Sequence, residues 1–443
     1  MGSDELTSAT ARRLADAIAG RECSALEVVE AHLRRIDDVN GAINAVVQVD
    51  AERALARARE ADEALAAGDR RGPLHGVPFT VKDNISAAGI PMAIGARERV
   101  GVVPDEDATV VGRLAAAGAI LLGKTNCPEY GGGIETDNEV YGRTSNPYDL
   151  ARTPGGSSGG EAAIVAAHGS PCGLGTDSGA SARLPAHFCG LASIKPSAGR
   201  VPLTGVIDDE GQLGTLGDPR TQVAPLARSV EDAALVLALI CGPDGRDGGL
   251  APVPLAGLAG VELADLRVAV QTDNEHHAPT PETAAAVERA AGVLREAGAE
   301  VEEARHPDGG HAVTIDVWRS YGDGVEAAEL WRVLRRWDAF RSDMLAFADR
   351  YDLVVCPVFP GPARLHGTMN APGEIDPTSF TTPHSLTGWP AATVRAGSSA
   401  EGLPIDVQLV ARPWRDDVAL AAARQVEQAL GGWTPPRRPP RAR

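Results

Sequence analysis

The pattern of apolar and polar positions predicts helices first, and then strands and helices in alternation. Two amphipathic helices open the chain, and the capping box from Ser24 to Glu27 begins the second. An Ala- and Arg-rich helix follows at about residues 50–67. Residues 77–81 form a short apolar run that predicts a buried strand ending at Lys82. Open α/β sheets place their chemistry at such strand ends.

The remaining pattern predicts a layered α/β fold. Helices are expected at residues 108–117 and 283–297, and strands at 119–122, 267–270, 351–357 and 405–410. Residues 242–264 are rich in Gly, Pro and Ala and predict a surface excursion. Since no internal repeat or linker is visible, we expect one domain over residues 1–443, with a helical N-terminal segment (1–70) and a core (71–443).

Charge restricts the class of partner. The 443 residues carry a formal net charge of −18, whereas proteins that bind nucleic acid usually present a basic surface. The first residues are partly acidic and helical in pattern, unlike a signal peptide, and no apolar run is long enough to span a membrane. We therefore expect a cytoplasmic protein with no direct nucleic-acid or membrane partner.

The cysteines do not predict a metal site. Six cysteines are scattered without the CxxC spacing of zinc sites or an evident disulfide framework. Cys172 and Cys189 lie near His168 and His187 in sequence, which leaves a cysteine nucleophile open, although packing is the favoured role. We expect no metal and no cofactor.

Lysine is rare, which draws attention to each one. Lys82, Lys124 and Lys195 are the only lysines among 42 basic residues. Arginine can replace lysine in most cationic positions but cannot lose its proton and act as a base. Because Lys124 and Lys195 adjoin segments that read as structural, Lys82 is the favoured base.

Two glycine-serine clusters suggest acyl transfer. In the second, the backbone N–H groups of Ser178, Gly179, Ala180 and Ser181 can converge on one point and hold the negative charge on a substrate oxygen. Ser181 would need a base, and no histidine lies in a recognisable triad context. Lys82 can serve if burial lowers its pKa from about 10.4, with a second serine relaying the proton.

The first cluster, residues 155–159, also matches the G-x-S-x-G nucleophile elbow of α/β-hydrolases. That elbow follows a buried strand, whereas residues 146–154 are polar and contain prolines. The context disfavours this alternative.

Residues 155–183, together with 81–84, resemble the amidase signature family. The resemblance extends over most of the chain through shorter stretches at 123–126, 194–196, 225–232, 386–390, 402–404 and 408–410. It implies an α/β/α architecture of three layers, in which helices surround a large central mixed sheet and the N-terminal helices pack on the outside.

The resemblance also implies the roles of the site residues. Ser181 would be the nucleophile, Ser157 the bridging serine entered through a cis peptide bond, and Lys82 the base. Ser157 and Ser181 have the 24-residue separation usual in the family, which selects Ser157 over Ser158. The implied reaction is hydrolysis of a carboxamide through an acyl-enzyme, without a metal.

Two residues depart from the family pattern Gly-Gly-Ser-Ile-Arg. Ala180 replaces a glycine and would be strained by about 1–2 kcal/mol if the position required a positive φ. Ala182 replaces a branched residue and should loosen the packing behind the nucleophile. Asp177 and Arg183, which flank the loop, are expected to form a buried ion pair.

Three functions follow from these observations. The first is an amidase acting on a small-molecule amide, with esters as a side activity and a homodimer as one assembly open to it. The second is a glutaminase-type subunit that supplies ammonia to an amidotransferase complex. The third is a catalytically weak relative that acts as a binding protein. Trp318, Tyr321 and Trp331 fit a substrate pocket and a core equally well.

Overall fold

The computed structural model describes residues 1–209, 211–215, 218–322, 325–369 and 376–436. These residues build one eleven-stranded sheet with the order β1-β3-β2-β4-β6-β5-β10-β11-β9-β7-β8. Parallel pairs (β2 with β3 and β4, β7 with β8 and β9) occur beside antiparallel pairs, so the sheet is mixed. The strands are β1 (Val46–Val49), β2 (Pro78–Lys82), β3 (Ile120–Thr125), β4 (Cys172–Asp177), β5 (Ala192–Lys195), β6 (Gln222–Ala227), β7 (Arg267–Val270), β8 (Glu300–Glu303), β9 (Leu353–Pro357), β10 (Ala391–Ser398) and β11 (Pro404–Ala411).

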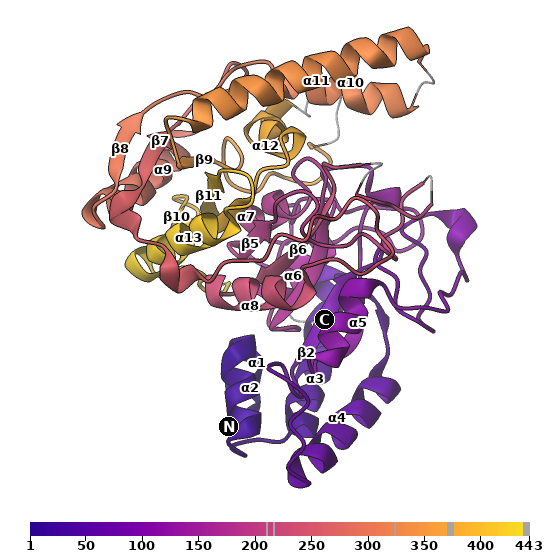
Figure 1. Cartoon of the computed structure of the whole chain (residues 1–443). Coiled ribbons are helices and arrows are strands. Elements are labelled where there is room, and N and C mark those ends of the chain that lie inside the picture. The colour runs from indigo at the N-terminus through magenta and orange to yellow at the C-terminus, as the bar shows by residue number, and fades with distance from the viewer. Residues whose placement is uncertain (210, 216–217, 323–324, 370–375, 437–443) are drawn as a thin grey trace.

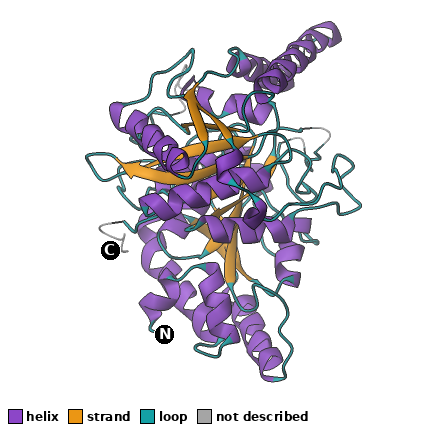
Figure 2. Cartoon of the chain, turned by 60° about the vertical axis from the view of Figure 1, so that its left-hand side comes forward, coloured by secondary structure: helices purple, strands orange, loops and turns teal. Residues whose placement is uncertain are grey.

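Helices surround this sheet (Figure 2). They are α1 (Ser3–Ser8), α2 (Ala11–Ala19), α3 (Ala25–Ile43), α4 (Ala51–Ala66), α5 (Thr109–Ala116), α6 (Gly159–Ala166), α7 (Arg183–Cys189), α8 (Val230–Ile240), α9 (Pro281–Glu296), α10 (Gly310–Gly322), α11 (Ala327–Ala348), α12 (Thr382–Leu386) and α13 (Asp416–Leu430).

The central strands are covered on both faces. Every residue of β2, β4, β6 and β11 is buried, and successive residues of a strand point to opposite faces. Two rows of helices provide the cover: α5, α8, α13 and α9 contact one another in that order, as do α3, α6 and α7. The predicted α/β class with a large mixed sheet is confirmed.

The sheet places two polar strand ends side by side. Strands β2 and β4 are parallel neighbours, with Val81 paired to Leu174. Their C-terminal ends therefore carry Lys82 and Thr176 to the same edge of the sheet. The loops that follow β4 and precede α6 contain Ser181 and Ser157.

Two regions differ from the sequence-based expectation. The first predicted helix is two helices, because the Thr10 side chain accepts a hydrogen bond from the Arg13 N–H and begins α2 anew. The pattern did not predict the hairpin of α10 and α11, which projects from the body at the top of Figure 1. Helices α1 to α4 lie at the opposite end of that view.

No described helix is both long and apolar enough to cross a bilayer.

A buried carboxyl group fixes α6 against the sheet. Glu161 of α6 accepts hydrogen bonds from the hydroxyls of Thr80 on β2 and Thr125 on β3. Burial raises the pKa of Glu161 to about 8, although these hydroxyls act in the opposite direction. A Cβ at Gly173 of β4 would lie 1.9 Å from Glu161 Oε1, so this glycine makes room for the carboxyl group.

Gly173→Ala should therefore destabilise the protein by about 1–3 kcal/mol, because the added methyl group overpacks the sheet against Glu161. The measurement is the midpoint of thermal unfolding followed by circular dichroism. Gly292→Ala in α9 is the matched control, because a Cβ there would have no atom within 4 Å. We expect the control to be unchanged or more stable by about 0.5–1 kcal/mol. Equal midpoints for Gly173→Ala and the unmodified protein would contradict this packing.

Candidate active site

Lys82 is a buried amine that faces two hydroxyls. Its Nζ lies 2.6 Å from Ser157 Oγ and 2.7 Å from Thr176 Oγ1. The residue is 1% exposed, and no carboxylate of the described residues forms an ion pair with it. Burial lowers the pKa of Lys82 to about 8, while Cys127 and Asp177 act in the opposite direction. A neutral amine is therefore accessible near physiological pH.

Ser157 and Ser158 have different surroundings. The peptide bond between Gly156 and Ser157 is cis, as the resemblance implied. The Ser157 hydroxyl faces Lys82, whereas the Ser158 hydroxyl donates to the Thr176 carbonyl and accepts from the Thr176 N–H. Ser158 is thus used to attach its loop to β4. The structure brings Ser157 to the lysine, in agreement with the choice made from spacing.

Ser181 lies on the wall of the same cavity as Lys82 and Ser157. The two serine loops are joined through the main chain, since the Ser158 N–H donates to the Ser181 carbonyl at 2.9 Å. The Ser181 hydroxyl itself makes no hydrogen bond to another described residue. The structure therefore joins Lys82 and Ser157 by a direct hydrogen bond. It places Ser181 on the wall of the same cavity, where its hydroxyl has no hydrogen-bond partner among the described residues.

The predicted oxyanion donors lie in this loop. Ser178, Gly179, Ala180 and Ser181 all line the cavity. None of their N–H groups donates to an acceptor within the described part of the chain. The N–H groups of the next two residues, in contrast, donate to Asp177. Four backbone donors thus stay available at the cavity wall.

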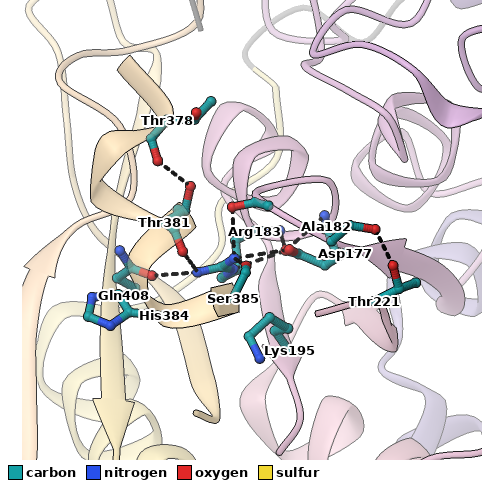
Figure 3. Close-up of polar contacts among 12 residues, drawn as sticks. Asp177, Ala182, Arg183, Lys195, Thr221, Thr378, Thr381, His384, Ser385 and Gln408 are labelled. Carbon is teal, nitrogen blue, oxygen red and sulfur yellow. Dashed lines mark hydrogen bonds and ion pairs between the residues drawn. The ribbon is translucent and has the colours of Figure 1, made fainter. Parts of the chain in front are cut away.

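A buried ion pair holds the loop, as predicted. Arg183 Nη2 and Nε each lie 3.0 Å from an oxygen of Asp177, and both side chains are fully buried. Burial alone would raise the pKa of Asp177, but Arg183 lowers it. The guanidinium also donates to the Gly179 carbonyl, to Ser385 on α12 and to Gln408 on β11 (Figure 3).

The cavity beside these residues has a volume of about 1140 Å³. Gly131 lies close to Ser157 and Lys82, because a Cβ there would be 3.4 Å from Ser157 Oγ and 3.8 Å from Lys82 Nζ. Trp318 of α10 packs close to the loop of residues 178–181, because a Cβ at Gly179 would lie 2.8 Å from the indole ring. The cavity can hold a substrate considerably larger than an acetamide.

The three aromatic residues that fitted either a pocket or a core do not lie in the same surroundings. Trp318 lines the cavity, whereas Trp331 is 65% exposed on α11 and belongs to neither pocket nor core. The side chain of Tyr321 lies outside the described residues.

Ala180 carries no left-handed strain. It is absent from the residues with positive φ, so the condition for the predicted strain is not met. Its methyl group packs with Leu184, Phe188 and Met369 in a small apolar cluster. Ala182 is fully buried in the main core. The departures from the family pattern therefore fit the backbone of this chain.

The competing bases are less well placed. Lys124 Nζ lies 3.3 Å from a carboxylate oxygen of Asp83, and neither residue is exposed. Burial and Arg183 lower the pKa of Lys195 to about 7, but Lys195 Nζ donates to the Pro196 carbonyl and does not line the cavity. A depressed pKa alone thus does not identify the base.

The cysteine alternative has no geometric support. Burial raises the pKa of both Cys172 and Cys189 above that of an ordinary thiol. Neither cysteine lines the cavity, and His187 is bound to the Gly361 carbonyl and the Asp406 N–H. Among the described residues, no group of three or more His, Cys, Asp or Glu side chains is arranged to hold a metal ion.

Thr176 and Asn84 were missed by the sequence analysis. Thr176 Oγ1 accepts from Asn84 Nδ2 at 3.3 Å and from Lys82, so it fixes the direction in which the amine points. Both residues line the cavity. The available signal was the polar end of the apolar run 172–177, but its pairing with the strand of Lys82 could not be read from one sequence.

Comparison with known proteins gives a consistent result. The Amidase family model matches residues 27–328 and 319–420. A glutamyl-tRNA(Gln) amidotransferase subunit from Chloroflexus aggregans is 35% identical over 484 residues, with 96% of this chain and 97% of that protein covered. The structure of a 6-aminohexanoate cyclic dimer hydrolase has a TM-score of 0.84 and 29% identity, covering 98% of this chain and 99% of that one.

The peptide amidase of Stenotrophomonas maltophilia is similar at 26% identity and a TM-score of 0.79, covering 97% of this chain and 98% of that one. The family model spans far more than half of the sequence and includes both serine loops. The chain therefore belongs to the amidase signature family, whose enzymes hydrolyse amide bonds.

Proposed function

We propose that this chain is a stand-alone amidase that cleaves the C–N bond of a small-molecule carboxamide through an acyl-enzyme on Ser181. Contact of the buried amine of Lys82 with the Ser157 hydroxyl, beside a cavity that also exposes Ser181, carries this proposal. Burial supplies the base, and the wall supplies backbone donors for the oxyanion.

The proton path follows from these contacts. Neutral Lys82 donates one N–H to Thr176 Oγ1 and accepts the proton of Ser157 at its lone pair. As Ser181 Oγ attacks the carbonyl carbon, Ser157 takes the proton of Ser181 and passes its own to Lys82. The N–H groups of residues 178–181 hold the oxyanion of the tetrahedral intermediate.

Collapse of the intermediate reverses the relay. The C–N bond breaks, Ser157 donates a proton to the departing amine, and Lys82 returns its extra proton to Ser157. Water then attacks the Ser181 ester and loses its proton along the same path. The products are a carboxylic acid and an amine, and the enzyme is restored.

Ser181→Ala should lower kcat on any responsive amide at least about a thousandfold, because no other hydroxyl replaces the nucleophile. The variant should also lose covalent labelling by a fluorophosphonate. Ser193→Ala is the control, because its buried hydroxyl donates to the Pro225 carbonyl away from the cavity and labelling should persist. Full turnover by Ser181→Ala would remove the assignment, and absence of labelling in the unmodified protein would favour the binding-protein alternative.

The dependence of kcat/KM on pH should report Lys82. Only the neutral amine can accept the Ser157 proton, so activity should rise about tenfold per pH unit below the pKa of about 8 and level off above it. Lys82→Arg keeps the positive charge but supplies no base, and should lower kcat about a thousandfold or more. A profile that stays flat through this range, or an active Lys82→Arg enzyme, would show that another group is the base.

A second candidate function is that of a glutaminase subunit within an amidotransferase assembly. The observation that favours it is the 35% identity to the Chloroflexus aggregans amidotransferase subunit over 97% of that protein's length. We expect the purified chain alone to hydrolyse simple amides at a rate that added lysate does not change. Glutamine hydrolysis that appears only with a co-purifying larger partner would instead establish the subunit function. Pull-down from the source cells followed by a glutaminase assay makes this comparison.

A further inference from the structure

The cavity wall is acidic. Among the described residues that line it, Asp208, Asp209 and Asp218 are acids, and Arg220 and Lys82 are the only bases. A bound molecule therefore meets more negative than positive charge.

Both basic residues already have a role. Arg220 Nε lies 2.8 Å from Asp218 Oδ1, and the Arg220 N–H donates to the same oxygen. The other oxygen of Asp218 accepts from the Thr221 hydroxyl, which also hydrogen bonds with Ser178. This pair is thus built into the wall and attached to the nucleophile loop, while Lys82 has to be neutral to act as the base. The charge of Arg220 is thus offset by Asp218, and Lys82 has to lose its charge to act as the base.

The wall also presents acceptors that lack donors. Asp209 is exposed to the cavity, forms no ion pair and accepts no hydrogen bond from another described residue. Asn84 is 4% exposed, and its Nδ2 donates to Thr176, yet its buried Oδ1 has no partner among the described residues. A buried acceptor without a donor is unfavourable, so a ligand that brings N–H groups gains by supplying one.

We infer that the substrate carries a protonated amine remote from the scissile amide and no carboxylate in the part that fills the cavity, with Asp209 as the residue that selects the charge. This inference rests on the proposed amidase function of the same cavity. An ammonium group offers three N–H donors and a positive charge to the acidic wall. A carboxylate there would meet Asp209 on a wall whose described acids outnumber its bases.

Free glutamine meets this criterion only in part. Its α-ammonium group suits the acidic wall, whereas its α-carboxylate would face described acids that outnumber the bases.

Two matched series of amides test the inference. In the first, δ-aminovaleramide, hexanamide and glutaramate place a cation, a methyl group or an anion at the far end of the acyl chain. In the second, N-(aminoethyl)acetamide and N-propylacetamide place the charge in the departing amine. We expect kcat/KM for the cationic member to exceed that of the neutral one about fivefold in at least one series, and glutaramate to be the poorest substrate.

The charge preference should depend on Asp209. Asp209→Asn should bring the cationic and neutral members to within about twofold of each other, and high salt should act in the same direction by screening an exposed carboxylate. Asp69→Asn is the matched control, an exposed acid that does not line the cavity, and should keep the preference. Absence of a preference for the cation in both series, or a preference that Asp209→Asn leaves intact, would overturn the inference.

Failure of this inference can be separated from failure of the proposed function. Protection of Ser181 from fluorophosphonate labelling measures binding of the same amides without requiring turnover. If Ser181 is labelled and the neutral member of each series is hydrolysed as well as the cationic member, the amidase function stands and the charge selection is wrong. If Ser181 is not labelled, the proposed function itself is wrong, and equal binding of charged and neutral amides in a competition assay would reject the charge selection independently.

Discussion

The buried ion pair of Asp177 and Arg183 is the constraint on which the candidate site depends. A buried pair is tolerated only when each partner is fully hydrogen bonded, since a lone buried charge is strongly destabilising. Asp177 meets this condition with Arg183 and two N–H groups, and Arg183 with Gly179, α12 and β11. The loop of residues 178–182 is thereby held at both ends. The N–H groups of residues 178–181 donate to no acceptor in the described part of the chain, which is why we propose them for the oxyanion.

Burial affects the charge of arginine differently from that of lysine and glutamate. An arginine stays charged when buried and therefore has to be paired, as Arg183 is. Lysine and glutamate can instead become neutral, and burial shifts the pKa of both Lys82 and Glu161 to about 8. Burial beneath the two serine loops therefore has two effects. Arg183 stays charged and anchors the loop through Asp177, whereas Lys82 can become neutral and is the base that we propose.

Much of this arrangement could be predicted from local sequence, and the part that could not depends on pairing between distant segments. The strand ending at Lys82, the α/β class and the ion pair all follow from short patterns of burial and charge. Thr176 was missed because its role arises from the parallel pairing of β2 with β4, which no local pattern encodes. The break at Thr10 was missed because a threonine cap interrupts an otherwise continuous amphipathic pattern. Trp331 fitted a substrate pocket and a core equally well in the sequence, yet it lies exposed on α11.

The contact between Trp318 and Gly179 has a consequence for how this enzyme can diversify. The indole belongs to a peripheral helical hairpin, whereas the residues of the proposed proton relay belong to the sheet and the two serine loops. A smaller or larger side chain at position 318 would change the size of the cavity beside Gly179 without altering Lys82 or Ser157. Variation at this one position on the hairpin can therefore alter which molecules fit, while Lys82 and Ser157 on the sheet side keep their contact.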